Sequence, residues 1–252
     1  GALNINGAVT GGGFSLALNT TGTTTIGAAI SGITTLTTNA VGTTAINADV
    51  SSSGAQTYND NVTLSGAART LTSTSSGAIF FDGTIDGTQD LTVATGGLTT
   101  FDGLVGSTTI LGAIDISGAG GLDLNAAIAN TNGSAGAASL DVNGATNLGA
   151  NVVTTGAQIY TGATTVSADI SLKNTNNNVT FSDALDSDGT LRDLTIDTDG
   201  NTGIILFSGA VGQNNDFDAI AITGNLDLDA DIGTTGAAAG AASLAVTGAT
   251  AL

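Results

Sequence analysis

The chain lacks Cys, Pro, Met, Trp and His altogether, and all 21 acidic residues among its 252 are Asp, because the sequence holds no Glu. Catalysis that depends on a Cys nucleophile or a His base is therefore excluded. Good helix formers are also scarce, whereas the abundant Asp, Asn, Gly and Thr prefer turns, caps and strands. We expect neither a helical fold nor an enzyme.

Positive charge is nearly absent, since Arg69, Lys173 and Arg192 are the only cationic side chains and the net charge is −18. Such a surface repels phosphate backbones and anionic membranes. No run approaches the roughly 18 apolar residues of a spanning helix. We therefore expect no nucleic acid partner and no membrane insertion by this segment. A positive partner, a divalent cation or an uncharged sugar remains compatible with it.

Large side chains are also few, because aromatic residues make up 4% of the chain and much of the 41% hydrophobic content is Ala. The core must then be thin and repetitive, as in solenoids. Short alternating runs separated by Gly, Asn, Asp and Ser clusters predict strands. Residues 225–232 show the alternation best, and we expect Asp227, Asp229 and Asp231 to face outward along one strand.

A short period of 20 residues is visible near the start of the sequence. Leu16, Asn19, Thr24, Ile26 and Ile30 return as Leu36, Asn39, Thr44, Ile46 and Val50. About 20 residues is one coil of a β-helix, so 252 residues predict roughly a dozen coils.

A longer period of about 103 residues lies over the short one. Gly54, Ala55, Gln56 and Tyr58 recur as Gly156, Ala157, Gln158 and Tyr160. This super-repeat divides the chain into the end of one copy at 1–50, a second copy at 51–153 and an incomplete third copy at 154–252. The prediction is an all-β fold, a right-handed parallel β-helix that forms one continuous solenoid over residues 1–252.

The segment 43–64, with Gly54-Ala55-Gln56-Thr57-Tyr58 at its centre, resembles the repeats of filamentous-haemagglutinin-like and autotransporter-type surface proteins of Gram-negative bacteria. The resemblance implies large secreted proteins whose β-helical shafts project from the cell and mediate adhesion, aggregation or matrix formation. We accordingly expect an extracellular or cell-surface location and a structural or adhesive role.

The repeat pattern runs to both ends of the sequence, so further copies of the repeat, or like chains stacked end to end, are expected partners, together with host or matrix glycans. Two alternatives remain open. One is a self-assembling extracellular filament built from end-to-end solenoids. The other is a β-helix that binds polysaccharides, or cleaves them with carboxylates set in a groove.

Clustered aspartates are candidate calcium ligands, since hard cations prefer carboxylate oxygens. The candidates are Asp186, Asp188, Asp197, Asp199, Asp227, Asp229 and Asp231. Two Asp-x-Asp-Gly stretches, at 186–189 and 197–200, lack the final bidentate acid of a calcium loop. We interpret these residues as turn and surface aspartates, and we predict little specific calcium binding, no other cofactor and no catalytic residue.

Overall fold

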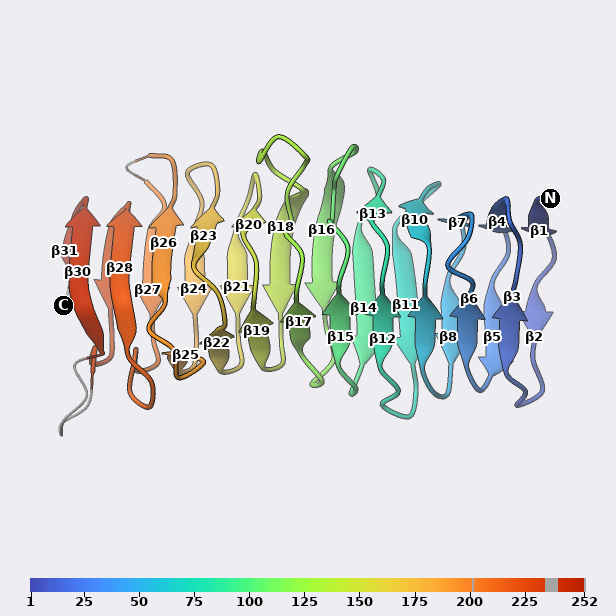
Figure 1. Cartoon of the computed structure of the whole chain (residues 1–252), viewed down its shortest axis with the longest axis horizontal. Coiled ribbons are helices and arrows are strands. Elements are labelled where there is room, and N and C mark those ends of the chain that lie inside the picture. The colour runs from blue at the N-terminus through green and yellow to red at the C-terminus, as the bar shows by residue number, and fades with distance from the viewer. Residues whose placement is uncertain (201, 234–239, 252) are drawn as a thin grey trace.

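Each turn of the chain contains up to three short strands, because brief apolar runs alternate with corners rich in Gly, Asn and Asp. The computed structural model describes residues 1–200, 202–233 and 240–251. Within these residues the fold is a parallel β-solenoid of about 11 turns, spaced about 22 residues apart, which confirms the predicted fold class. The two ends of the chain lie at opposite ends of an elongated rod (Figure 1).

The strands form three faces that run the length of the rod. The first face holds two five-stranded sheets, which the single-residue bridges of Val105 and Ile128 connect. Its strands are β1 (Leu3–Ile5), β4 (Thr23–Ile26), β7 (Thr43–Ile46), β10 (Asn61–Leu64), β13 (Ile85–Asp86), β20 (Val152–Val153), β23 (Ile170–Lys173), β26 (Asp193–Asp197), β28 (Phe217–Thr223) and β30 (Ala241–Thr247).

The second face is a twelve-stranded sheet. Its strands are β2 (Val9–Thr10), β5 (Ile30–Ile33), β8 (Val50–Ser52), β11 (Arg69–Ser73), β14 (Leu91–Thr95), β16 (Leu111–Ile116), β18 (Ala137–Val142), β21 (Gln158–Tyr160), β24 (Val179–Phe181), β27 (Ile204–Phe207), β29 (Asn225–Leu228) and β31 (Thr250–Ala251).

The third face is a nine-stranded sheet that the bridges of Val211 and Ile232 extend. Its strands are β3 (Leu16–Leu18), β6 (Leu36–Thr38), β9 (Gln56–Tyr58), β12 (Ile79–Phe81), β15 (Thr99–Phe101), β17 (Leu122–Leu124), β19 (Thr146–Leu148), β22 (Thr164–Val166) and β25 (Leu185–Ser187).

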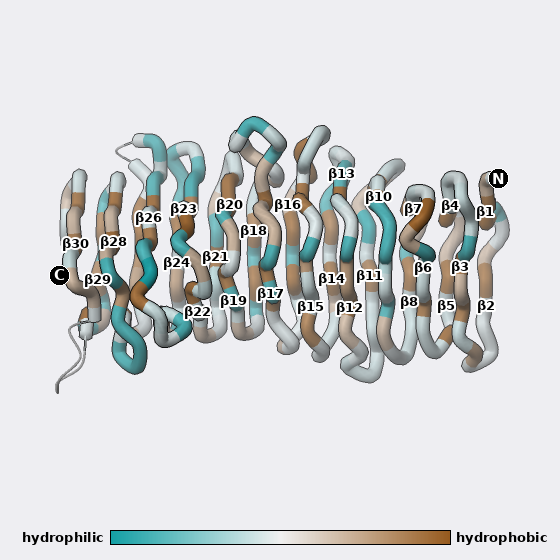
Figure 2. Tube along the Cα trace, viewed as in Figure 1, coloured by the Kyte–Doolittle hydropathy of each residue, from teal (hydrophilic) through white to brown (hydrophobic). Residues whose placement is uncertain are grey.

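Inward side chains stack in columns, because parallel strands in register place like residues about 4.8 Å apart. On the second face Val50 pairs with Leu71 and Leu71 with Val93, and all three are buried. Apolar stretches recur at corresponding places from turn to turn (Figure 2). The predicted 20-residue step is confirmed at the start of the rod, where Leu16 pairs with Leu36.

Later turns are not all equally long. Leu140 pairs with Gln158, a step of 18 residues, whereas Ile116 pairs with Val142, a step of 26. Corner loops absorb the difference, and the longest of them project from the rod (Figure 1).

The unequal turns rotate the super-repeat around the rod. Gln56 and Tyr58 lie on β9 of the third face, whereas their counterparts Gln158 and Tyr160 lie on β21 of the second face. Each turn crosses the three faces once, so the cross-section is a triangle and each strand or bridge forms one of its sides. From β9 to β21 the chain passes twelve strands and the two bridges at Val105 and Ile128, which makes fourteen sides. One copy therefore spans four turns and two further sides, so the next copy is displaced by one face.

Buried aromatic rings mark this rotation. Tyr58 stacks on Phe81 at 5.0 Å between ring centroids, and Phe101 follows at 5.5 Å. In the third copy Tyr160 stacks on Phe181 at 4.9 Å, and Phe207 follows at 5.5 Å, but on the second face. The second and third copies thus each fill their core with a Tyr-Phe-Phe stack.

A buried Gln accompanies each stack. Gln158 Nε2 donates to Lys173 O at 2.9 Å, to Thr154 Oγ1 at 3.2 Å and to Val152 O at 3.3 Å, and Tyr160 OH donates to Gln158 Oε1 at 3.2 Å. Gln56 and Tyr58 form the same network in the second copy. Since both Gln side chains are fully buried, these bonds join consecutive turns inside the rod.

Candidate functional site

Asp186 lies on β25 and holds a loop of the next turn, residues 212–216. Its Oδ1 accepts the backbone N–H groups of Asn214 at 3.0 Å and Asn215 at 3.4 Å, and its Oδ2 accepts Asn214 Nδ2 at 2.8 Å. This carboxylate therefore already has donors on both oxygens. Asp186 itself lies within a strand and not in a turn, and the loop that it holds belongs to the next turn of the solenoid.

Asp86, at the end of β13, plays the same role in the second copy, and the sequence reasoning did not single it out. It accepts hydrogen bonds from Thr108 N at 2.7 Å, Thr109 N at 3.0 Å and Ser107 Oγ at 2.7 Å, and so holds the loop 106–110. Partial burial raises the pKa of Asp86, but these hydrogen bonds outweigh burial and keep the pKa below its usual range. Its equivalence to Asp186 in the long repeat was the available signal.

Asp188 is paired with Arg192. The guanidinium Nη2 lies 2.7 Å from Oδ2 and Nε lies 3.1 Å from Oδ1, while Thr190 N–H donates to Oδ1 at 3.0 Å. The hydrogen bonds from Arg192 and then from Thr190 lower the pKa of Asp188 to about 2.

Asp197 pairs with Lys173, whose Nζ lies 3.3 Å from Oδ2, and its Oδ1 accepts the N–H of Asp199 at 2.8 Å. Asp199 adopts a φ of 50°, a left-handed conformation that Asp tolerates in turns. The second Asp-x-Asp-Gly stretch is thus a turn stabilised by one cation.

The prediction that Asp227, Asp229 and Asp231 lie along one strand is wrong. Strand β29 ends at Leu228, so only Asp227 is on it, and Ile232 already bridges Val211 on the third face. Asp229 and Asp231 lie on the corner between these faces, where the alternation of small and acidic residues is compatible with a turn. The alternation of apolar and acidic residues continues through this corner, and for that reason the sequence predicted a longer strand.

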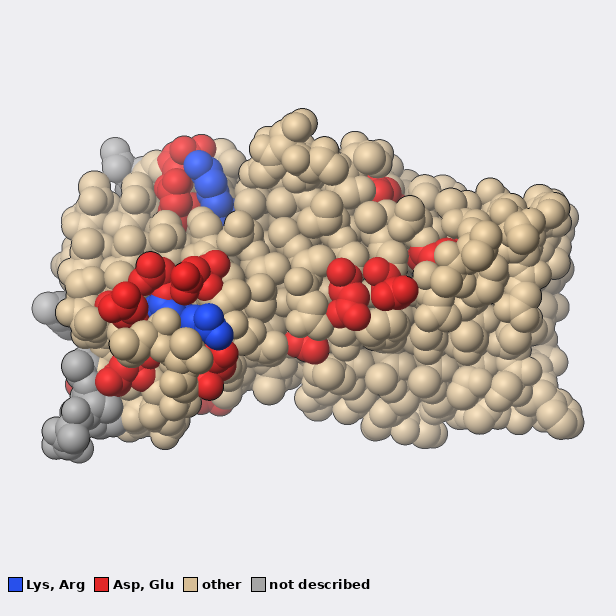
Figure 3. Space-filling model, viewed as in Figure 1, with Lys and Arg blue, Asp and Glu red and all other residues tan. Residues whose placement is uncertain are grey.

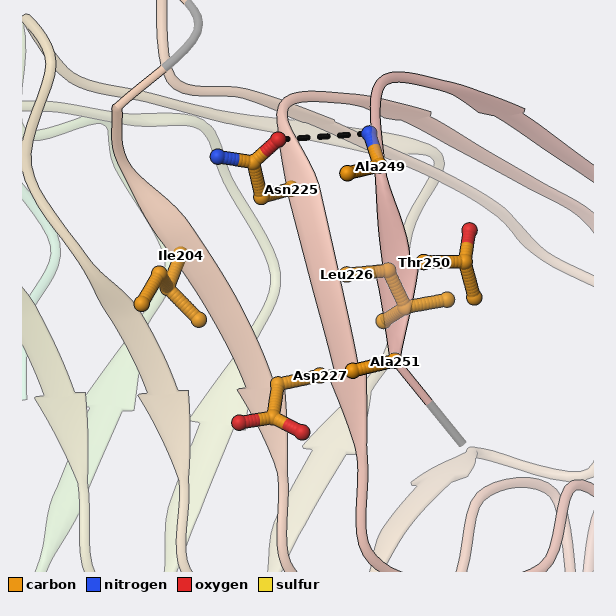
Figure 4. Close-up of a pocket in the computed structure, with 7 residues that line it drawn as sticks. All are labelled: Ile204, Asn225, Leu226, Asp227, Ala249, Thr250 and Ala251. Carbon is orange, nitrogen blue, oxygen red and sulfur yellow. Dashed lines mark hydrogen bonds between the residues drawn. The ribbon is translucent and has the colours of Figure 1, made fainter.

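Asp227 borders a concavity of about 270 Å³ on the outer side of β27, β29 and β31. Its lining is Ile204, Asn225, Leu226, Asp227, Ala249, Thr250 and Ala251 (Figure 4). Asn225 Oδ1 accepts Ala249 N–H at 3.2 Å. Asp227 is the only titratable side chain in this lining, so the concavity offers no pair of carboxylates for acid–base chemistry.

A more polar hollow of about 310 Å³, which we call the loop cleft, lies between corner loops. Its lining residues are Gly133, Ser134, Ala135, Val153, Lys173, Asn174, Thr175 and Asp199. The first three residues belong to a small hairpin closed by the antiparallel bridge between Ala129 and Ala135. The cleft brings together one cation and one carboxylate among hydroxyl and amide groups.

Two further carboxylates meet on the second face, which the sequence reasoning missed. Asp115 and Asp141 are register partners on β16 and β18. Burial, and then the negative charge of Asp115, raise the pKa of Asp141. Their 26-residue separation hid the pairing, because the short period near the start of the chain is 20.

Asp60 is the most deeply buried carboxylate among the described residues, with 4% exposure. It accepts hydrogen bonds from Thr38 Oγ1 and Thr44 Oγ1, each at 2.8 Å. The third copy has Gly162 at this place, so the site belongs to the second copy alone.

The seven calcium candidates are therefore distributed over three successive turns, with two or three on each. Across residues 1–200, 202–233 and 240–251, no three acidic side chains form a group that could hold a metal ion. Figure 3 shows acidic side chains gathered near the C-terminal end and near the middle of the face in view, whereas the end near β1 carries no acidic or basic side chain there. This agrees with the sequence, in which Asp49 is the first charged residue.

Comparison with protein-family models, with curated proteins and with solved structures gives no match. Among the described residues there is no helix that is long and apolar enough to cross a bilayer.

Proposed function

We propose that the chain is a length of the structural and adhesive shaft of a secreted or cell-surface bacterial protein, which attaches to surfaces or to an extracellular matrix. The observation that supports it is the continuity of the rod. Buried apolar columns and parallel pairing extend through about 11 turns, and the concavities along the rod are small. Such a molecule spans distance and presents contacts along its outside.

The chemistry of the outer surface favours uncharged partners. A net charge of −18 repels polyanions, and each of the three cationic side chains lies within 4 Å of an Asp carboxylate. Many corners expose hydroxyl and amide groups of Thr, Ser and Asn, and these groups exchange hydrogen bonds with sugar hydroxyls. Host or matrix glycans are therefore the partners we assign to the shaft.

Beads coated with the folded chain test this function on epithelial monolayers and on deposited extracellular matrix. We expect them to adhere more than albumin-coated beads, and to lose adhesion when the target is stripped of its glycans. Adhesion no greater than that of albumin would contradict the adhesive role. Release of oligosaccharides from a soluble polysaccharide would contradict a purely structural surface.

A further inference from the structure

Two exposed loops occupy equivalent places in successive copies of the super-repeat. We call residues 106–110 the first display loop and residues 212–216 the second. Each follows a bridge residue, Val105 or Val211, and each begins with a Gly of positive φ, 74° at Gly106 and 64° at Gly212. Each leads directly into a long strand, β16 or β28.

The backbone of both display loops is fixed by one carboxylate from the turn before. Asp86 binds the N–H groups of Thr108 and Thr109, and Asp186 binds those of Asn214 and Asn215. A loop held in this way loses little conformational entropy when it binds a partner, which favours affinity.

The exposed side chains differ between the two loops although the frame is the same. The first display loop exposes Thr108, Thr109 and Ile110, and the second exposes Gln213, Asn214 and Asn215. The anchoring Asp is retained while the outward residues change, which separates a supporting role from a contact role. Because the polar groups among them are hydroxyls and amides without a cation, they suit neutral glycans.

Because one copy of the super-repeat passes fourteen sides of the rod, the two loops lie at different corners. The first display loop lies at the corner between the first and second faces, and the second lies at the corner between the third and first faces (Figure 1). At about 4.8 Å per turn, four and two-thirds turns separate them by roughly 22 Å along the rod, with a rotation of one face.

We propose that the two display loops are glycan-contact elements, one in the second copy and one in the third, which the shaft presents at the two corners that border the first face. This inference rests on the proposed adhesive function. It implies that a rod whose first face lies against a flat surface engages both loops together, because both corners border that face.

The test uses the complete 252-residue chain over flat sensor surfaces coated with neutral oligosaccharides that end in galactose, glucose, mannose or N-acetylglucosamine. Thr108→Ala/Thr109→Ala alters the first display loop, and Gln213→Ala/Asn215→Ala alters the second. Neither pair of substitutions removes the backbone bonds to Asp86 or Asp186. Thr37→Ala/Thr63→Ala, at exposed strand positions, is the matched control.

We expect each single-loop variant to dissociate about tenfold faster than the wild type, because the two linked contacts hold the rod on one surface together and removing either leaves only the other. The four-substitution variant should lose at least a further tenfold in binding. Loops that acted separately would instead leave each single-loop variant with about half of the wild-type binding and a dissociation rate within about twofold of it. Asp86→Ala should match the first single-loop variant although it keeps Thr108 and Thr109.

Dissociation within about twofold of the wild type in both single-loop variants would overturn the joint display. So would complete loss with one loop and none with the other, or unchanged binding of the four-substitution variant, both of which leave the adhesive function intact. If the wild type binds no glycan of the panel, the glycan assignment in the proposed function fails, and this inference fails with it.

Discussion

Gln158 and Tyr160 carry polar groups into a largely aliphatic and aromatic core, and they do so without unpaired atoms. Gln158→Leu leaves the Tyr160 hydroxyl buried without its acceptor. We expect the free energy of unfolding to fall by about 2–4 kcal/mol, since each unpaired buried polar group costs about 1–3 kcal/mol. Urea unfolding followed by far-ultraviolet circular dichroism measures it.

The double variant Gln158→Leu/Tyr160→Phe serves as the control for this network. Removing both partners eliminates the unpaired hydroxyl, so we expect part of the lost stability to return. A double variant as unstable as the sum of the two single variants would show that the hydrogen bond between them contributes nothing.

The low pKa of Asp188 makes a pH-dependent contribution to folding. Its pKa is about 2 in the fold, against about 3.9 in an unfolded chain, so the carboxylate stabilises the fold above about pH 4 and this contribution disappears as the pH falls toward 2. We expect the NMR titration midpoint of Asp188 near 2. Arg192→Gln should raise this midpoint toward 3.9 and Arg69→Gln should leave it unchanged; equal midpoints in all three proteins would refute the role of Arg192.

At the scale of the element, corner geometry can be tested with a matched pair of glycines. Gly106 and Gly133 have nearly the same φ, 74° and 77°, but a Cβ at Gly106 would lie 1.9 Å from Gly136 O, while a Cβ at Gly133 meets nothing within 4 Å. Gly133→Ala should cost only the left-handed strain, about 1–2 kcal/mol. Gly106→Ala should cost about 1–3 kcal/mol more. Thermal unfolding compares them, and equal losses of stability would contradict the packing of this corner.

The inward columns of the strands were predictable from sequence because their register depends on local alternation. Leu91 with Val93 and Leu194 with Ile196 are buried as the alternation requires. The corners were not predictable, since Asp229 and Asp231 continue an alternating pattern beyond the end of β29. Alternation reports which side chains point inward, whereas the end of a strand depends on where the next face begins.

The rotation between copies could not be derived from the sequence either. A coil of 20 residues divides the 103-residue super-repeat into about five turns, which would place successive copies on the same face. The observed steps of up to 26 residues reduce this to four and two-thirds turns. Insertions at a few corners, such as 129–136, thus change the direction in which the whole copy faces.

At the scale of the whole molecule, dispersed carboxylates should respond to divalent cations by general screening. We expect calcium and magnesium at equal millimolar concentrations to raise the melting temperature by the same few degrees, because both reduce repulsion within a chain of net charge −18. A saturable rise of about ten degrees at micromolar calcium, and not with magnesium, would instead reveal a specific site.

The rotated stacking of successive copies is tested most directly by disulfide formation in this cysteine-free chain. Asp141 and Ile159 are outward register partners on adjacent turns of the second face, at a spacing of about 4.8 Å that a disulfide can bridge. We predict that Asp141→Cys/Ile159→Cys closes a disulfide on mild oxidation and that Asn147→Cys/Ile159→Cys does not. Closure of the second pair instead of the first would place β21 over β19 and contradict the rotation.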